Sequence, residues 1–486
     1  MIIKPATPDA YKLIQAGIET LARVEEIGIG VDIEYVKRTK ARLAKEMRQL
    51  EARLMESEEY TKLREHYGTK ANLNSAKQQV DLLYKIMRYD VRHVTDKGIP
   101  SIDEQALQEI GTPFTKDLLR LKKKQKLHGT FLSGIEAETE GDRLHCFFNL
   151  HIARTFRSSS DSINFQNLPV RDKEMAEVIR SAFVARPGFR IVETDYAGIE
   201  VRGAACYHKD PKMLRYIKDP SKCMHRDMAI QCYKLEGIDF PEGFWKSKEP
   251  SQGNGHTIRY AAKNMFVFPS FYGDYYVNMA RLMWEAIIKL DLRADGRSLL
   301  EHLASKGIRE RGDCINGASN DPAPGTFEHH IKEVEHDFWN NRFKVYGKWK
   351  RNWFDEYLRT GGFHMLTGFR IEGILSKNDV INWPVQGASF HCLLWSMIEL
   401  DAEMRRRKMK SRVIGQIHDS IVGEVHEKEL PAYAELIDEI MTKRIRDHWD
   451  WIIVPLDIEM EVAPVGGTWH QKKAYPVSDI VKGLIT

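Results

Sequence analysis

The sequence predicts an α+β fold, in which helical and strand-rich stretches are segregated along the chain. Residues 10–66 and most of 213–365 carry apolar side chains every three to four positions, the spacing of amphipathic helices. Short β-branched or alternating runs cluster near 143–150, near 189–195 and in the final third of the chain. Segregated helices and strands of this kind are typical of α+β domains.

Length and composition limit the function classes. The 486 residues are too many for one compact core and predict about three domains or subdomains. Hydrophobic residues make up 42% and charged residues 29% of the chain, which excludes disordered, fibrous and membrane proteins. The net charge is only +4, so any nucleic-acid contact has to come from local patches.

The chain carries no sign of export or of membrane insertion. The first residues, MIIKPATPDAYKL, contain no apolar signal core, and no apolar run is long enough to span a bilayer. The six cysteines are scattered without a C-x-x-C pair, so neither a disulfide scaffold nor a structural zinc site is predicted. We therefore expect a reduced, cytoplasmic compartment.

The N-terminal third reads as long helices. Residues 13–29 and 36–67 have helical spacing, and Asn74 or Ser75 can cap a following helix over ANLNSAKQQVDLLYKIM. A second basic helix, KDLLRLKKKQKLHGTF, carries five cations within seven residues: Arg120, Lys122, Lys123, Lys124 and Lys126. This run is either a solvated helix face or a contact to the phosphate backbone of a nucleic acid. The segment itself favours neither alternative.

Three stretches further along place chemically active side chains at the ends of elements. FRIVET predicts a strand that ends beside Asp195, and a helix is expected after Gly198. Arg259 and Lys263 lie one helical turn apart ahead of an aromatic run, which suits a phosphate clamp next to a stacking surface. SRVIGQIHDSIVGEVHE predicts a hairpin with Asp419 at its tip.

The final third supplies the remaining elements. FHMLTGFRIEG resembles a hairpin, and IVPLDIEMEVAP predicts a last strand. INWPVQGASFHCLL opens with what reads as a proline-bounded turn and continues as a long apolar helix.

Several of these stretches, in order, resemble the polymerase region of the family A DNA polymerases, the bacterial DNA polymerase I family. Residues 195–202 (DYAGIEVR) resemble the palm motif D-Y-S-Q-I-E-L-R, and 259–273 resemble the fingers motif R-x-x-x-K-x-x-x-F-G-x-x-Y-G. Residues 416–419 (QIHD) resemble the second palm motif, V-H-D-E. Residues 157–169 and 382–387 are similar to R-L-S-S-x-x-P-N-L-Q-N-I-P and N-x-P-x-Q-G, and ANLNSAKQ is similar to the thumb segment F-N-L-N-S-P-K-Q.

The resemblance implies a right-hand fold with a thumb, a palm built on an antiparallel sheet, and helical fingers. We expect thumb and N-terminal helices over 1–136, palm over 137–212 and 366–486, and fingers over 213–365. An insertion is expected near 290–330, where the chain runs longer than the family. The exonuclease domain that precedes the thumb in the family is expected to be absent. The divergent motifs suggest a phage-like origin.

The implied activity is extension of a primer 3′ end with dNTPs on a DNA template, without proofreading in cis. Two Mg²⁺ ions, which Mn²⁺ can replace, stabilise the attacking hydroxyl and the leaving pyrophosphate in such chemistry. The resemblance makes Asp195, Asp419 and Tyr196 the metal site and Lys263 a general acid for the pyrophosphate. The implied partners are primer-template DNA, dNTPs and a separate exonuclease or replisome proteins, and the chain is expected to be a monomer without membrane contact.

The resemblance also implies which side chains contact the substrates. Glu200 is the expected sugar gate, whose side chain leaves no room for a 2′-hydroxyl. The implied dNTP-binding residues are Arg259, Lys263, His225, Phe268, Tyr272 and Glu200. The implied primer and template contacts are Arg157, Asn164, Gln166, Asn167, Gln386 and His418, and polar donors among these suit the shared acceptors of the minor groove.

The sequence departs from the family pattern at three places. The fingers motif has one extra residue, so the family phenylalanine is either Phe268 or Val267; we favour Phe268 and expect a π-bulge, with strain from Pro269. Ser420 stands in place of the second carboxylate of H-D-E, with Glu424 as the nearest other carboxylate of the hairpin. Phe156 stands in place of a glycine, and Ala197-Gly198 in place of Ser-Gln.

Two alternatives remain open. One is a relative of the single-subunit RNA polymerases, against which Glu200 and the form of the fingers motif argue. The other is a catalytically impaired, DNA-binding accessory protein, which only Ser420 favours.

Overall fold

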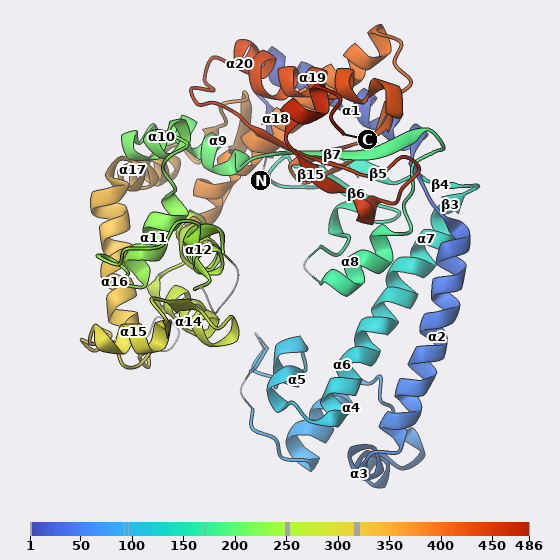
Figure 1. Cartoon of the computed structure of the whole chain (residues 1–486), viewed down its shortest axis with the longest axis vertical. Helices are drawn as coiled ribbons and strands as arrows, with labels where there is room; N and C mark the ends of the chain where they lie inside the picture. The colour runs from blue at the N-terminus through green and yellow to red at the C-terminus, as the bar shows by residue number, and fades with distance from the viewer. Residues whose placement is uncertain are drawn as a thin grey trace.

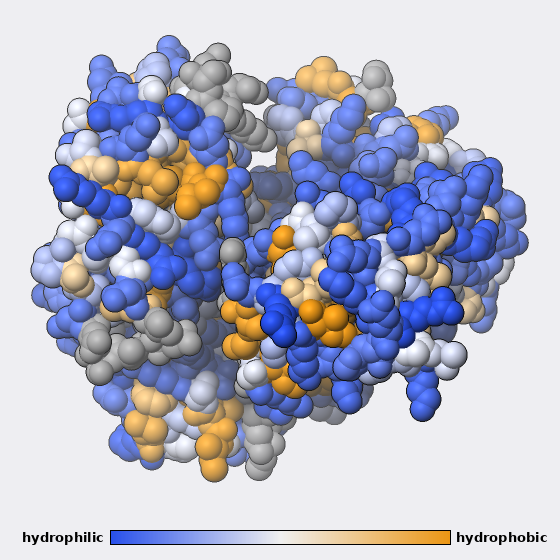
Figure 2. All heavy atoms as spheres, turned by 90° about the horizontal axis from the view of Figure 1, so that it is seen from below, coloured by the Kyte–Doolittle hydropathy of each residue, from blue (hydrophilic) through white to orange (hydrophobic). Residues whose placement is uncertain are grey.

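A computed structural model describes residues 2–91, 93–95, 97–170, 172–247, 253–314 and 321–485. A five-stranded sheet, here named the palm sheet, lies at the top of Figure 1. A group of helices (α10 to α17, here the fingers helices) lies on one side below it, and a second group (α2 to α7, here the thumb helices) lies on the other. The lower face of the molecule is largely hydrophilic, with apolar side chains in separate groups (Figure 2).

The palm sheet is antiparallel throughout, in the order β12-β13-β7-β14-β15. Its strands are β7 (Phe189–Tyr196), β12 (Arg412–Ile417), β13 (Ser420–His426), β14 (Ile458–Val462) and β15 (Lys473–Tyr475). The predicted hairpin is confirmed, because Ile417 pairs with Ser420 and leaves a two-residue turn at its tip. The predicted strands at β7 and β14 are also confirmed, whereas β15 was not predicted.

Helices cover the upper face of the palm sheet in Figure 1. They include α1 (Pro8–Ile27), α18 (Lys377–Arg406), α19 (Leu430–Glu439) and α20 (Ile445–His448). The turn expected at Pro384 is wrong, because Pro384 lies inside α18. A proline in a helix leaves the carbonyl four residues earlier without its donor. Here Trp353 Nε1 donates to that Val380 carbonyl at 3.0 Å, so the helix continues.

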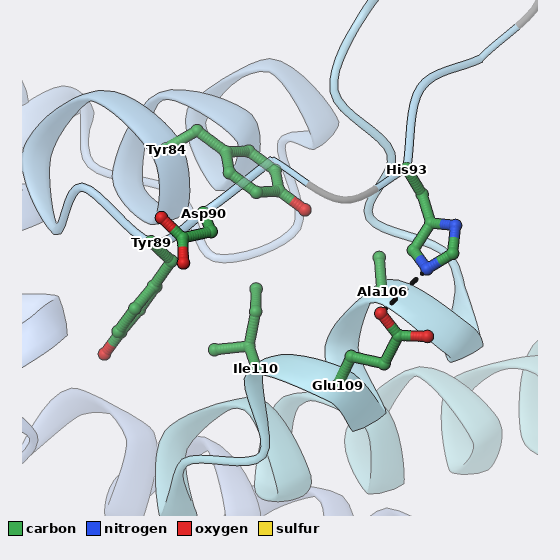
Figure 3. A pocket seen from close by; sticks show the side chains of 7 residues that line it. All are labelled: Tyr84, Tyr89, Asp90, His93, Ala106, Glu109 and Ile110. Atoms are coloured by element: carbon green, nitrogen blue, oxygen red, sulfur yellow. Dashed lines mark hydrogen bonds and ion pairs between the residues drawn. The ribbon is translucent and has the colours of Figure 1, made fainter. Parts of the chain in front are cut away.

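The thumb helices have a small core of their own, separate from the main core. They are α2 (Ile33–Met55), α3 (Glu58–Tyr67), α4 (Ala76–Val80), α5 (Glu104–Ile110), α6 (Pro113–Gln125) and α7 (Ser133–Glu138), with π turns at Asp81–Ile86 and Lys126–Leu132. A pocket of about 130 Å³ opens at the end of the thumb, walled by Tyr84 and Tyr89 and closed on one side by the His93–Glu109 contact of 2.8 Å (Figure 3).

The basic run of α6 is used mainly within the protein. Lys123 pairs with Asp172 and Glu104, each at 2.9 Å, and Lys124 pairs with Glu46 at 2.6 Å. Of the two alternatives that the sequence left open, these ion pairs favour a structural role. The cations hold α6 against neighbouring elements, and a phosphate contact by them would have to compete with these carboxylates.

The fingers helices follow α9, which leads out of the palm sheet. Their bounds are α9 (Ile199–His208), α10 (Pro211–Lys218), α11 (Met224–Cys232), α12 (Gly255–Ala262), α13 (Phe268–Tyr272), α14 (Tyr276–Lys289), α15 (Leu299–Ser305), α16 (Phe327–Asp337) and α17 (Lys344–Thr360). The described part of the expected insertion forms the hairpin β8 (Arg293–Ala294) and β9 (Arg297–Ser298) and then α15. Residues 315–320 of that insertion lie outside the described residues.

Smaller elements complete the described chain. The hairpin expected over 363–373 is confirmed as β10 (Gly362–His364) and β11 (Phe369–Glu372), to which β1 (Ile2–Pro5) adds a third strand. The others are β2 (Ile29–Gly30), β3 (Thr139–Glu140), β4 (Arg143–Leu144), β5 (Phe147–Asn149), β6 (Ser159–Asp161), α8 (Lys173–Arg180) and α21 (Val477–Val481). In the part of the chain that the structure describes, no helix is both long and apolar enough to cross a membrane.

Candidate active site

The palm sheet brings two aspartates together from distant parts of the sequence. Asp195 lies near the end of β7, directly opposite Ser420, the first residue of β13. Asp419 precedes Ser420 in the hairpin turn, and its backbone carbonyl accepts a hydrogen bond from Tyr196 N at 3.3 Å. The two carboxylates therefore share one edge of the sheet.

The environment of this pair suits divalent cations. Partial burial, and then the charges of Asp419, Glu193 and Glu459, raise the pKa of Asp195 to about 7. Burial likewise raises the pKa of Asp419 to about 6, against the opposing effect of Arg157. Asp419 Oδ1 is buried without a hydrogen-bond partner among the described residues. Two crowded carboxylates with a free oxygen are a fitting donor set for Mg²⁺, which completes its shell with substrate phosphates and water.

Other possible metal ligands near Asp195 and Asp419 are engaged in contacts within the protein. The Tyr196 ring points into the core, where its hydroxyl lies 2.9 Å from Ser396 Oγ, so only its backbone carbonyl remains for a metal. Among the described residues no group of three or more His, Cys, Asp and Glu side chains is placed to hold an ion. The carboxylate of Glu424 is fully buried and accepts from Arg186 Nε at 2.6 Å, so it serves the structure.

Ser420, which stands in place of the second carboxylate of the family pattern, makes hydrogen bonds within the palm sheet. Its hydroxyl donates to the Ile417 carbonyl at 3.0 Å and to Glu193 at 3.3 Å. Glu193 also binds Lys472 and accepts from Trp469 Nε1 at 2.8 Å. Burial acts to raise the pKa of Glu193, but Lys472 and Arg180 hold it below its usual range. The negative charge of Glu193, two residues before Asp195, is therefore balanced by Lys472 and Arg180.

A cavity of about 500 Å³ opens beside the aspartates. Its walls combine palm, fingers and α18 residues, among them Arg157, Glu200, Phe268, Tyr272, Gln386 and Asp419. Glu200, at the start of α9, accepts hydrogen bonds from both Arg157 and the Tyr272 hydroxyl. Arg157 Nη2 also lies 3.8 Å from Asp419 Oδ1. The expected sugar gate thus links the fingers to the carboxylate pair.

A cluster of cations lies on the fingers side. His225 from α11 stands near Arg259 and Lys263, and burial together with these two charges lowers the pKa of His225 to about 4. Lys263 Nζ lies 5.0 Å from the centroid of the Phe268 ring. His225 Nε2 and Arg259 Nε are buried without a hydrogen-bond partner in the described part of the chain. Unsatisfied donors of this kind suit an incoming polyanion.

The extra residue of the fingers motif is absorbed as predicted. Residues Lys263–Val267 form a π turn between α12 and α13. Beyond it Phe268 lines the cavity, whereas Val267 is buried in the core. Pro269 follows this π turn inside one uninterrupted helical run, from Gly255 to Tyr272, so the strain expected at Pro269 stays a prediction.

The remaining departures from the family pattern lie where the backbone is left-handed. Gly198 has φ +63° and turns the chain from β7 into α9. Phe156 has φ +59°, a left-handed backbone that favours the glycine of the family pattern. Its ring packs against Phe369, with centroids 4.5 Å apart, so side-chain packing holds this conformation.

The expected primer and template residues divide into two groups. Arg157, Gln386 and His418 line the cavity. Gln166 instead donates to Ser158 and Gln416, each at 2.7 Å. Asn164 caps a short helical turn by accepting from Asn167 N at 3.1 Å, and Asn167 itself is exposed.

Sequence reasoning missed two cavity residues. Asn382 of α18 donates to the Tyr272 carbonyl at 3.1 Å, and it is the first residue of the segment similar to N-x-P-x-Q-G. Tyr346 of α17 lines the same cavity, and no sequence signal pointed to it.

Comparison with known proteins agrees with this geometry. The family model described as DNA polymerase family A matches residues 34–240 and 373–471. The unmatched stretch between them contains the lengthened fingers motif and the expected insertion. DNA polymerase I of Chloroflexus aurantiacus is 27% identical over 470 residues, which is 95% of this chain and 43% of that protein. A DNA polymerase of Bacillus phage SP01 is 26% identical, over 77% of this chain and 37% of that protein.

A solved structure supports the fold. The POL domain of Pol1 from M. smegmatis, in complex with DNA primer-template and dNTP, has a TM-score of 0.69 and 22% sequence identity. The match covers 94% of this chain and 70% of that one. The predicted fold of thumb, palm sheet and helical fingers is thereby confirmed. The chain spans less than half the length of the curated relatives named above.

Proposed function

Because the chain belongs to DNA polymerase family A, we propose that it extends the 3′ end of a DNA primer with deoxynucleotides, on a DNA template. One observation carries the proposal: Asp419 of the aspartate pair lines the same cavity as Phe268, and Lys263 of the fingers stands 5.0 Å from the centroid of the Phe268 ring. Nucleotidyl transfer needs carboxylates at the attacking hydroxyl and positive charge at the leaving pyrophosphate.

Asp195 and Asp419 would hold Mg²⁺, or Mn²⁺ in its place, together with the Tyr196 backbone carbonyl. When bound, these ions supply charge stabilisation at the 3′-hydroxyl and at the phosphate under attack. Arg259 and His225 bind the triphosphate through their unsatisfied nitrogens. Lys263, which stands above the Phe268 ring, gives a proton to the leaving pyrophosphate.

Selection of the sugar and of the base pair falls to the cavity wall. Glu200, held by Arg157 and Tyr272, blocks the 2′ position of the nucleotide, and Phe268 packs against the sugar. Gln386, His418 and Arg157 contact the primer end and the minor groove of the new pair. Asn164, Gln166 and Asn167 contact the template and primer strands next to this pair.

The first test is primer extension with dNTPs and Mg²⁺ by the wild type and by Asp195→Asn and Asp419→Asn. We expect each substitution to lower the extension rate at least about a thousandfold. DNA affinity, measured separately by fluorescence anisotropy, should stay within a few-fold. Equal rates in wild type and variants would refute the catalytic assignment. A wild type that binds primed DNA without extending it would instead support an accessory role.

We also propose that this chain synthesises without editing, since every motif it shares with the family belongs to the polymerase region. The test uses a primer with a mispaired 3′ end, Mg²⁺ and no dNTP. The primer should remain intact over the time in which a paired primer is fully extended. If the mispaired primer is shortened, and the shortening persists in both Asp195→Asn and Asp419→Asn, a separate nuclease centre is present.

A further inference from the structure

A second cavity, of about 250 Å³, lies on the fingers behind α10. Four cations line it, namely Lys212, Arg215, Lys222 and Arg342, with two carboxylates, Asp227 and Asp337. Helix α10 separates this cavity from the candidate active site. Lys212 faces the smaller cavity, while its neighbour Met213 lines the larger one.

Both carboxylates of the smaller cavity are bound to neutral donors. Asp227 accepts from the Tyr216 hydroxyl at 2.6 Å. Asp337 accepts from the side-chain amides of Asn341 and Gln231, at 2.9 and 3.0 Å. Asp227 also lies 3.6 Å from Arg226 Nε, and Arg226 does not line the cavity. The hydrogen bonds of the two acids are therefore made to groups other than the four cations of the cavity.

The cations form no ion pair with a carboxylate of the described residues, although the charges of Arg342 and Lys212 act on Asp337 and help to lower its pKa. Arg342 donates only to neutral oxygens, Tyr216 Oη at 2.8 Å and Gln231 Oε1 at 3.1 Å, and its Nε is buried without any partner among the described residues. Lys212, Arg215 and Lys222 form no ion pair with a carboxylate that the structure describes. The cavity wall carries four positive and two negative side chains, so its net charge is positive. The Arg342 guanidinium adds a donor without a hydrogen-bond partner among the described residues.

We propose that this cavity binds a phosphate group. Arginine and lysine side chains that converge without carboxylate partners are the usual recognition set for phosphate oxygens. The volume is below the roughly 300–1,000 Å³ of pockets for drug-sized ligands, which favours phosphate, pyrophosphate or a single backbone phosphate over a whole nucleotide.

The group has two possible sources with the same chemistry. One is free phosphate or pyrophosphate, and the other is a phosphodiester of a DNA strand that passes over the fingers. Helix α11 connects the cavity to the active site, because His225 belongs to the catalytic cation cluster and Asp227, half a turn later, lines the phosphate cavity. The site is distinct from the triphosphate site of the proposed function, since the two share no side chain.

The experiment measures pyrophosphate binding by calorimetry without divalent cations. Since Arg259 and Lys263 are expected to bind pyrophosphate themselves, both are first replaced by alanine. In this background one pyrophosphate should still bind. Adding Arg215→Gln and Lys222→Gln should weaken it roughly tenfold or more, because charge-assisted hydrogen bonds are lost. Lys218→Gln, on the same helix but outside the cavity, is the matched control and should change nothing.

Binding that the cavity substitutions leave unchanged, or no binding in the alanine background, would overturn the proposal. The substituted side chains are exposed, and thermal unfolding checks that the variants are folded. Failure here leaves the proposed polymerase function untouched, since primer extension is measured separately on otherwise wild-type protein.

DNA binding then separates the two sources. If the source is a DNA phosphate, the Arg215→Gln, Lys222→Gln variant binds primed template more weakly, and the slope of log K against log salt falls by about two. If the source is free phosphate, DNA affinity and salt slope stay at the wild-type values while pyrophosphate binding is lost.

Discussion

Asp195 and Ser420 face each other as a directly opposed pair across β7 and β13. The serine stands where the resembled family carries a second carboxylate, and its hydroxyl is turned to Glu193 and the Ile417 carbonyl. The edge of the sheet that holds the candidate metal pair therefore carries one carboxylate fewer than the family pattern.

Replacing Ser420 by glutamate should restore that carboxylate. Because a further anionic oxygen strengthens binding of a hard cation, we expect the Mg²⁺ concentration for half-maximal primer extension to fall roughly three- to tenfold. Ser420→Gln has nearly the same shape without the charge and is the control. The same Mg²⁺ requirement in both variants would contradict an electrostatic role for this position.

Asp195 should make the metal-free protein less stable as pH rises. Its folded pKa of about 7 lies above the unfolded value of about 3.9, so the folded state holds more protons between these values, and stability falls as pH rises from about 4 to 7. The Asp195→Asn variant lacks this carboxyl group, so it should not lose this stability as the pH rises. We expect its Tm to exceed that of wild type by roughly 1–3 °C at pH 8 and to match it near pH 4.

Mg²⁺ supplies the control for this pH effect. At pH 8 it should raise the Tm of wild type by mass action and leave that of Asp195→Asn nearly unchanged. An equal Mg²⁺ effect on both proteins would place the ion elsewhere.

Glu200→Ala should change both sugar selection and rate. The substitution opens space for a 2′-hydroxyl, and it also releases Arg157 and Tyr272 from their shared acceptor. We therefore expect ribonucleotide incorporation to rise at least about tenfold relative to dNTPs, while kcat/KM for dNTPs falls. Tyr272→Phe loses one hydrogen bond and keeps the carboxylate, so its ribonucleotide rejection should stay close to wild type. Unchanged rejection in Glu200→Ala would remove the gate assignment.

Lys350 should make stability rise with pH above neutrality. It belongs to α17 of the fingers helices, donates to the Ser270 carbonyl at 3.1 Å and stands 3.7 Å from the centroid of the Trp339 ring. Burial, aided by Lys377, lowers its pKa to about 7, so between pH 7 and 10 the unfolded state holds the extra proton. The free energy of unfolding should thus rise by about 2 kcal/mol from pH 7 to pH 9.

Lys350→Met keeps much of the volume and removes the titrating group, so this rise should be absent in it. Denaturant unfolding at the two pH values checks both proteins. A parallel pH dependence of wild type and Lys350→Met would assign the effect to other groups.

Local signals were sufficient for much of the fold. Alternating side chains predicted the β12–β13 hairpin with Asp419 at its tip, and an apolar β-branched run predicted β7 with Asp195 near its end. A count of residues in the fingers motif predicted the π turn at Lys263–Val267. Each of these features depends on neighbours within a few positions, which is why the sequence carries it.

Other features were decided by contacts between distant segments. Pro384 stays in a helix because Trp353 satisfies the carbonyl that the proline leaves free. The basic run of α6 is neutralised by Asp172, Glu104 and Glu46, none of which is near it in sequence.

The sequence by itself predicted which residues carry the chemistry, through motifs that resemble the family pattern and follow its order. Only the tertiary structure decided how they are coupled. It joined Glu200 to Arg157 and Tyr272, gave Ser420 a partner in Glu193, and left the cations behind α10 without an ion pair to a described carboxylate. Side-chain hydrogen bonds and charges act over a few ångströms of space, so segments far apart in the chain set the partners that a linear pattern leaves open.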